Sequence, residues 1–91
     1  MKDDKNIIEY SKYESVDDFI KSIKYGKEVG ISYKGVDYGV FLIDEMYYFC
    51  ESKHEETEVS FSSVEDLLEV DIQGERLKDI ITEVELWLRN V

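Results

Sequence analysis

Apolar residues recur at helical spacing near the start of the chain. Four of them fall at offsets of 0, 3, 4 and 7, on one face of a helix: Val16, Phe19, Ile20 and Ile23. Ser15 precedes this face and Asp18 follows three residues later, which is typical of a helix start because the hydroxyl accepts a first-turn N–H. Glycine is favoured just past a helix end, so the pattern predicts a helix of about ten residues ending near Gly26.

The same signal returns 48 residues later, with Ser63 and Asp66 in the places of serine and acid. Three apolar residues form the matching face: Val64, Leu67 and Leu68. Gly74 again follows as the expected residue beyond the helix end. We interpret the repeat as two helix starts, not as a repeated functional motif.

Between the helices, polar and apolar residues alternate with turn signals at Lys34-Gly35 and Asp44-Glu45. The turns predict these cross-strand pairs: Tyr33 with Val36, Ile31 with Tyr38, Val29 with Val40, Leu42 with Tyr47, and Val40 with Phe49. Residues 57–61 alternate as a half-exposed strand. Residues 36–43 are apolar on both faces, so we expect this strand to be central. The pattern predicts a three- to four-stranded antiparallel meander.

Residues 75–91 carry the strongest helical pattern of the chain. Seven apolar residues form its stripe: Leu77, Ile80, Ile81, Val84, Trp87, Leu88 and Val91. We expect a long C-terminal helix packed on one sheet face, with Trp87 in the core. The predicted fold class is therefore α+β: an N-terminal helix, the meander, a short helix and the long helix. Residues 1–12 are expected to form an arm or an extra edge strand.

The length of 91 residues predicts a single domain spanning residues 1–91. No apolar run approaches the roughly 18 residues of a membrane helix, and no signal-peptide pattern opens the chain. We therefore expect a cytoplasmic protein. The single cysteine, Cys50, excludes an internal disulfide, and its apolar surroundings indicate a buried structural thiol.

Motifs for catalysis are missing from the sequence. It holds no phosphate loop, dinucleotide fingerprint or nucleophile elbow. His54 is the only histidine, and its spacing from Cys50 has no second ligand pair to complete a zinc site. We interpret His54 as a solvated loop residue, and paired carboxylates as parts of helix starts, turns and loops. We predict a non-enzyme without catalytic residues, cofactor or metal.

Charge is the feature that points to a partner. The net charge is −11, and residues 51–72 contribute −7, with Lys53 the only base among them. Such a field repels nucleic acid and anionic membranes and attracts a basic protein. The candidate partner-binding residues are Glu51, Glu55, Glu56, Glu58, Glu65, Asp66, Glu69 and Asp71. They form either a solvated face or a binding face that imitates the charge of a nucleic-acid backbone.

The phrases "SVDDFIKSIKYGKEVGISYKG", "FCES", "TEVSFSSVEDLL" and "IQGERLKDIITEVE" resemble small uncharacterised acidic proteins of Gram-positive bacteria and their prophages or mobile elements. The resemblance spans most of the chain from about residue 13 onward. It implies no known activity and assigns no functional residue. It does imply mobile-element biology, in which small acidic proteins often inhibit nucleases or other nucleic-acid-binding defence proteins.

These observations lead to two hypotheses about function. The first is a non-catalytic acidic protein that binds a basic partner. Its preferred specific form is an anti-defence or immunity-type inhibitor of a nucleic-acid-binding or nuclease defence protein, acting as a nucleic-acid mimic. The alternative is a small structural or regulatory adaptor that binds through the aromatic sheet face, with acidity serving only solubility. Salt dependence distinguishes them, because a charge-driven complex weakens with salt and an apolar complex does not.

Overall fold

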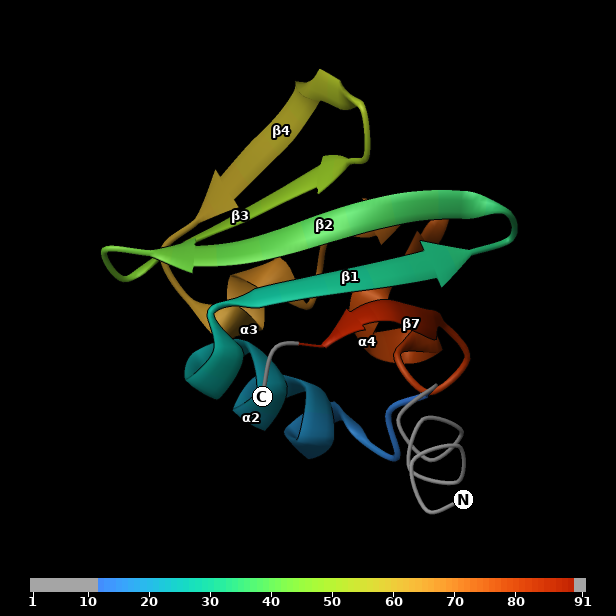
Figure 1. Cartoon of the computed structure of the whole chain (residues 1–91), viewed down its shortest axis with the longest axis horizontal. Helices are drawn as coiled ribbons and strands as arrows, with labels where there is room; N and C mark the ends of the chain where they lie inside the picture. Colours follow the sequence, from blue (N-terminus) through green and yellow to red (C-terminus); the bar gives the residue numbers. More distant parts are fainter. Residues whose placement is uncertain (1–11, 90–91) are drawn as a thin grey trace.

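The computed structural model describes residues 12–89 and shows an α+β fold (Figure 1). Its elements are α2 (Val16–Gly26), β1 (Glu28–Tyr33), β2 (Val36–Ile43), β3 (Met46–Glu51), β4 (His54–Phe61), α3 (Val64–Leu67), β5 (Asp71–Ile72), β6 (Glu75–Arg76), α4 (Leu77–Ile80) and β7 (Glu85–Arg89). The arm or extra strand predicted for residues 1–12 lies outside the described residues, except for its last position.

The antiparallel meander β1–β4 is present with the predicted register. Tyr33 pairs with Val36 across the first turn, and Leu42 pairs with Tyr47 across the second. Lys34 and Gly35 both have positive φ angles, as do Asp44 and Glu45. Two left-handed residues in a two-residue turn match the natural twist of a hairpin. The turn signals therefore fixed the register as expected.

The predicted long C-terminal helix is wrong. Helix α4 ends after four residues, and the chain then turns and adds β7 beside β1. The sheet has five strands in the order β4-β3-β2-β1-β7, so β2 is central as predicted. β5 and β6 form a separate two-stranded hairpin. The chain forms a strand here instead of a helix because the backbone N–H and C=O groups of β1 would be an unpaired sheet edge without β7.

The apolar stripe of residues 75–91 is divided between two kinds of structure. Leu77, Ile80, Ile81 and Val84 are all buried, as the helical pattern predicted. Beyond them Leu86 pairs with Ile31 and packs against the core, in a stretch where strand alternation fits equally well. Backbone pairing with β1 therefore outweighs local helix preference over Glu85–Arg89.

Both serine caps and the end of the first helix at Gly26 are confirmed, whereas Gly74 does not follow the end of the second helix. The Ser15 and Ser63 hydroxyls accept the backbone N–H of the residue three positions later, each at 3.1 Å. Helix α2 ends at Gly26, as predicted, and a left-handed Lys27 follows it as the cap residue, whereas α3 is only four residues long. Gly74 lies in the β5–β6 turn with a φ of 90°. The repeat therefore marks two helix starts whose continuations differ.

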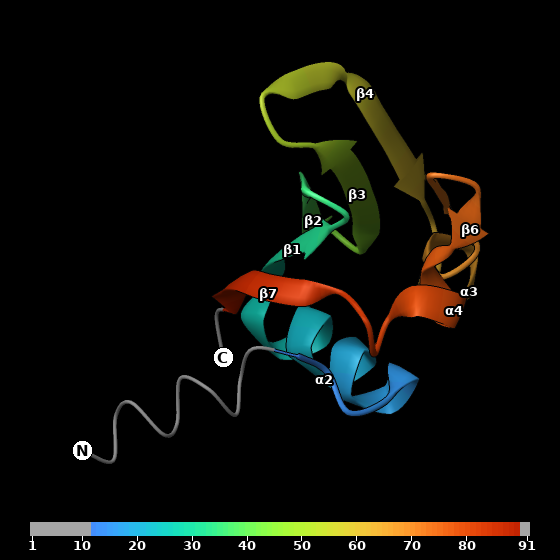
Figure 2. The ribbon, with the colours of Figure 1, turned by 90° about the vertical axis from the view of Figure 1, so that its right-hand side faces the viewer.

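The sheet has one face covered by helices, which we call the inner face, and one without helices, which we call the outer face. Figure 2 shows α3, α4 and β6 together on the inner side of the sheet. The inner side chains are buried with helix residues in one core: the largest fully buried ones are Tyr13, Phe19, Ile23, Ile31, Leu67, Ile72, Leu77, Ile80, Ile81, Val29, Val40 and Val84. The Gln73 amide ties the β5–β6 hairpin to the sheet by donating to the Tyr33 carbonyl and the Tyr38 hydroxyl.

Trp87 and Cys50 lie on the outer face, so their predicted burial in the core is wrong. The Trp87 side chain is 49% exposed, and its Nε1 donates to the carbonyl oxygen of Ile31 at 3.0 Å. A shift in register between Gly30 and Ile31 lets this ring fold over β1. Cys50 is half-buried on β3. Trp87 lies there because its segment forms a strand and not a helix. Cys50 is only half-buried because no described helix covers that face of the sheet.

Candidate protein-binding surface

The eight predicted partner-binding carboxylates separate into groups. Four surround the end of the β3–β4 hairpin, and we call them the acidic hairpin: Glu51, Glu55, Glu56 and Glu58. Glu65 and Asp66 lie in the first turn of α3, beyond the far end of β4. Glu69 follows α3, and Asp71 begins β5. The eight carboxylates are therefore distributed along an edge strand and the segment that follows it, and they do not form one patch.

The acidic hairpin owes its shape to Thr57. The β3–β4 register shifts between Phe49 and Glu51, which leaves extra residues on β4. The Thr57 hydroxyl accepts the Glu51 N–H at 2.9 Å and donates to the His54 carbonyl at 2.6 Å. This pair of bonds closes the bulge and satisfies backbone groups that the ladder leaves open. Glu55, which lies within the bulge, is exposed.

His54 opens β4 and stands between two carboxylates of the acidic hairpin. Its Nε2 lies 3.6 Å from Glu51 Oε2, and its Nδ1 lies 3.3 Å from Glu56 Oε2. The residue is exposed, as predicted, although it belongs to the strand and not to a loop. When protonated, this imidazole offsets part of the hairpin charge.

Two further carboxylates of the hairpin lie near the Cys50 thiol. Burial, and after it the negative charges of Glu58 and Glu55, raise the pKa of Cys50 above its ordinary value. The thiol is therefore held in its protonated form, which is a poor nucleophile. Ser60 pairs with Tyr48 and Glu58 follows the same alternation on β4, so the acidic hairpin borders the face of the sheet on which Cys50 lies.

Glu69 differs from the rest of the predicted set because two bases neutralise it. Its carboxylate contacts Lys78 Nζ at 2.8 Å and Arg76 Nε at 3.2 Å. The hydrogen bond from Lys78 is the main cause that lowers the pKa of Glu69. Sequence reasoning missed these pairs because they depend on the β5–β6 hairpin. Glu69 consequently offers a partner less net charge than the acidic hairpin does.

A groove of about 470 Å³ separates β4 from β5 on the inner side of the sheet. Its floor is apolar and includes Phe49 and Val59, of which Val59 is 43% exposed. Glu51 and Asp71 both line it, one from each wall. The groove therefore brings together two predicted acids that lie 20 positions apart in the sequence. The alternation of residues 57–61 placed Val59 inward but did not reveal the open space beneath it.

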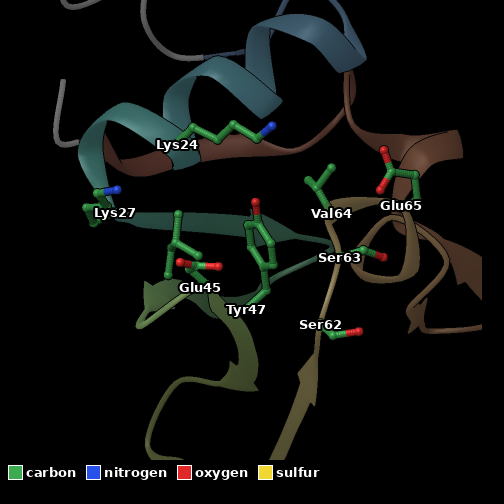
Figure 3. Close-up of a pocket in the computed structure, with 9 residues that line it drawn as sticks. Lys24, Lys27, Glu45, Tyr47, Ser62, Ser63, Val64 and Glu65 are labelled. Atoms are coloured by element: carbon green, nitrogen blue, oxygen red, sulfur yellow. The ribbon is translucent and has the colours of Figure 1, made fainter.

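A second cavity, of about 460 Å³, lies between α2, the β2–β3 turn and the start of α3 (Figure 3). Lys24 lies on α2 and Lys27 directly follows it, whereas Glu45 and Glu65 come from the opposite walls. The Tyr47 ring stands between them, and burial followed by the charge of Glu65 raises the pKa of its hydroxyl. The cavity holds two bases and two acids, so it favours neither an anionic nor a cationic ligand.

Other kinds of site find little support in residues 12–89. No helix there is long and apolar enough to cross a membrane. In the same range, His, Cys, Asp and Glu side chains form no group of three or more that could hold a metal ion. No protein-family model, curated protein or solved structure matches the chain. The resemblance to mobile-element proteins therefore stays a prediction.

Proposed function

We propose that this chain is a non-catalytic protein that binds a basic protein partner through the acidic hairpin. The observation that carries the proposal is the projection of Glu55, Glu56 and Glu58 from an exposed edge strand, held out by the Thr57 bonds. Glu51 and Asp71 add negative charge on the inner side of the sheet, where they line the groove between β4 and β5. Lys53 in the hairpin turn is the only nearby base in the tract.

Charge of this kind acts first on the rate of encounter. A surface of one sign steers an oppositely charged partner and raises the association rate, and salt weakens the effect. Because β3 and β4 are already paired, docking requires no ordering of this backbone, and the entropy cost is confined to the glutamate side chains. The proposed partner therefore presents lysine and arginine side chains on a complementary surface.

The narrower form of the proposal is inhibition of a nucleic-acid-binding or nuclease defence protein in the cytoplasm. It is supported by the sequence resemblance and by the succession of carboxylates along one exposed strand. A partner whose basic surface is occupied in this way loses access to nucleic acid. Competition measures this directly, because saturating amounts of this chain should displace a labelled oligonucleotide from the partner.

The alternative function is an adaptor that binds through the aromatic sheet face. The observation that favours it is the absence of a described helix on the outer face, where Trp87 and Ile43 are about half exposed. An adaptor of this kind needs no charge complementarity, so its affinity should change little with salt.

The test begins with capture of the partner from the native host and its purification. Glu55, Glu56 and Glu58 are then changed to lysine together, and the association rate is measured at low and high salt. We expect the rate to fall at low salt, and the difference from wild type to shrink at high salt. Exposed substitutions usually change stability by less than about 0.5 kcal/mol each, so the variant should remain folded.

The matched control reverses Asp3, Asp4 and Asp79, which removes the same charge from other parts of the chain. Asp79 is exposed on α4, away from the hairpin. We expect this variant to associate nearly as fast as wild type. An equal fall of the association rate in both variants would mean that the net charge of the chain, and not the acidic hairpin, attracts the partner. An unchanged rate in both variants would refute the proposal.

A further inference from the structure

The strand register sorts the side chains of the sheet into inward and outward positions. Directly paired residues share a face, so the row of Val29, Val40 and Phe49 points inward while the row of Glu28, Phe41 and Tyr48 points outward. Outward strand positions among the described residues are Glu28, Gly30, Ser32, Asp37, Gly39, Phe41, Ile43, Met46, Tyr48, Cys50, Glu58, Ser60, Glu85 and Trp87.

Aromatic rings form the centre of this outer face. Gly30 and Gly39 are directly paired on neighbouring strands, and each is covered by a ring. A Cβ at Gly30 would lie 2.5 Å from the Trp87 ring, and one at Gly39 would lie 3.1 Å from the Phe41 ring. Tyr48 stands beside Phe41 in the next strand. The two glycines thus leave room for the rings close to the strand backbone, and Trp87 remains 49% exposed there.

The charges around these rings have one sign. Outward positions carry Glu28, Asp37, Glu58 and Glu85, and between residues 28 and 87 no outward position of the five-stranded sheet holds a lysine or arginine. The acidic hairpin continues this border, because Glu58 belongs to it and lies two positions before Ser60, which pairs with the outward Tyr48. The outer face therefore combines exposed aromatic surface with negative charge.

We infer that the outer face binds an arginine-rich surface of the basic partner. A guanidinium group is planar and weakly hydrated, so it stacks on an aromatic ring while donating to a carboxylate at the ring's edge. A lysine ammonium is compact and strongly hydrated and gains less from the rings. The inference rests on the proposed function and adds to it the surface used and the kind of base recognised.

Other occupants fit the outer face less well. A second copy of the chain would bring four more outward carboxylates against the first four, and each chain carries a net charge of −11. A purely apolar partner would bury those carboxylates without a counter-charge, which is costly. An arginine-rich surface satisfies both the rings and the acids.

Trp87 provides the measurement, because it is the only tryptophan and lies on this face. The full chain is titrated with an oligoarginine peptide and, separately, with an oligolysine peptide of equal length, and indole emission is recorded. We expect oligoarginine to change the Trp87 emission and to bind at least about threefold tighter than oligolysine.

A pair of tyrosines supplies matched variants. Tyr48→Ala removes an outward ring, whereas Tyr25→Ala removes a ring that is 78% exposed on α2. We expect Tyr48→Ala to weaken oligoarginine binding at least about threefold and Tyr25→Ala to leave it unchanged. Tyr48→Phe retains the ring and should bind like wild type. Thermal unfolding of each variant establishes that its fold is intact.

The possible failures are distinguishable. Equal binding of both peptides, unaffected by Tyr48→Ala but lost in the hairpin reversal, would overturn this inference and leave the proposed function standing. Partner association that ignores the hairpin reversal would overturn the proposed function as well. Oligoarginine binding that appears only after residues 1–11 are removed would show that this segment covers the face, and would overturn the inference that the outer face of the full chain is the binding surface. A dimer that Tyr48→Ala dissociates would identify a second copy as the occupant and would refute an arginine-rich partner.

Discussion

The two faces of the sheet are built from the same strands but to different physical requirements. On the inner face, Val29, Ile31 and Val40 are buried to 1% exposure or less beneath the helices. On the outer face, the alternate positions hold glycines under aromatic rings, half-exposed apolar side chains and four carboxylates. Alternation of strand residues lets one short chain form a water-excluding face and a partly exposed face on opposite sides of the same sheet.

The comparison teaches which positions carry stability. Removing an inner side chain leaves a cavity that the surrounding residues cannot fill, so its cost exceeds that of transfer to water. An outer side chain already contacts solvent, and its loss costs little. Burial of the inward side chains decreases toward β4, however, where Val59 is 43% exposed beside the groove. Stability should therefore depend most on β1 and β2 and least on β4.

The largest effect is expected from Ile31→Ala on the inner face. Ile31 is fully buried in the core, and truncation of a buried isoleucine destabilises a protein by about 2–5 kcal/mol. Urea unfolding measures the change in the free energy of unfolding. A cost below about 1 kcal/mol would contradict the placement of Ile31 at the centre of the core.

A smaller effect is expected from Gly30→Ala, which tests how the outer face is assembled. The new Cβ would meet the Trp87 ring at 2.5 Å, so the ring must move and its hydrogen bond to the Ile31 carbonyl is strained or lost. Such overpacking costs about 1–3 kcal/mol. We also expect a red shift of the indole emission as the ring enters solvent.

Gly39→Ala is the matched control for that change. Its Cβ would lie 3.1 Å from the Phe41 ring, a contact that a small ring movement can relieve. Emission from Trp87 should therefore stay as in the wild type. An unchanged emission in Gly30→Ala would show that Trp87 does not cover Gly30.

The inner face was largely predictable from the sequence, because its signals are local. Two-residue turns at Lys34-Gly35 and Asp44-Glu45 fix the register, and alternation then assigns each side chain to a face. The outward direction of Phe41 and Ile43, toward Tyr48 and Met46, follows from the same pairs. The placement of Trp87 does not, since it depends on a strand added from the far end of the chain.

The acidic surface was predictable in composition but not in arrangement. Exposure of Glu55, Glu56 and Glu58 follows from their polar sequence and is confirmed. Neutralisation of Glu69 depends on bases in β6 and α4 that the β5–β6 hairpin brings back. Strands of two residues have no periodicity to detect, although Gln73-Gly74 is a turn signal that could have revealed the hairpin.

The smallest effect is expected from Ile43→Ala on the outer face. Ile43 ends β2 beside the Asp44-Glu45 turn, pairs with Met46 and is 55% exposed. Its truncation removes apolar surface that solvent already reaches, so the free energy of unfolding should change by no more than about 0.5 kcal/mol. The residue type and substitution match Ile31→Ala, and the difference between the two variants therefore measures the difference between the faces.

A cost for Ile43→Ala close to that of Ile31→Ala would mean that the outer face is covered in the free protein. In that case unfolding should be repeated with a chain lacking residues 1–11 and at several protein concentrations. If the cost disappears in the shortened chain, that segment is the cover; if it depends on concentration, the cover is a second copy.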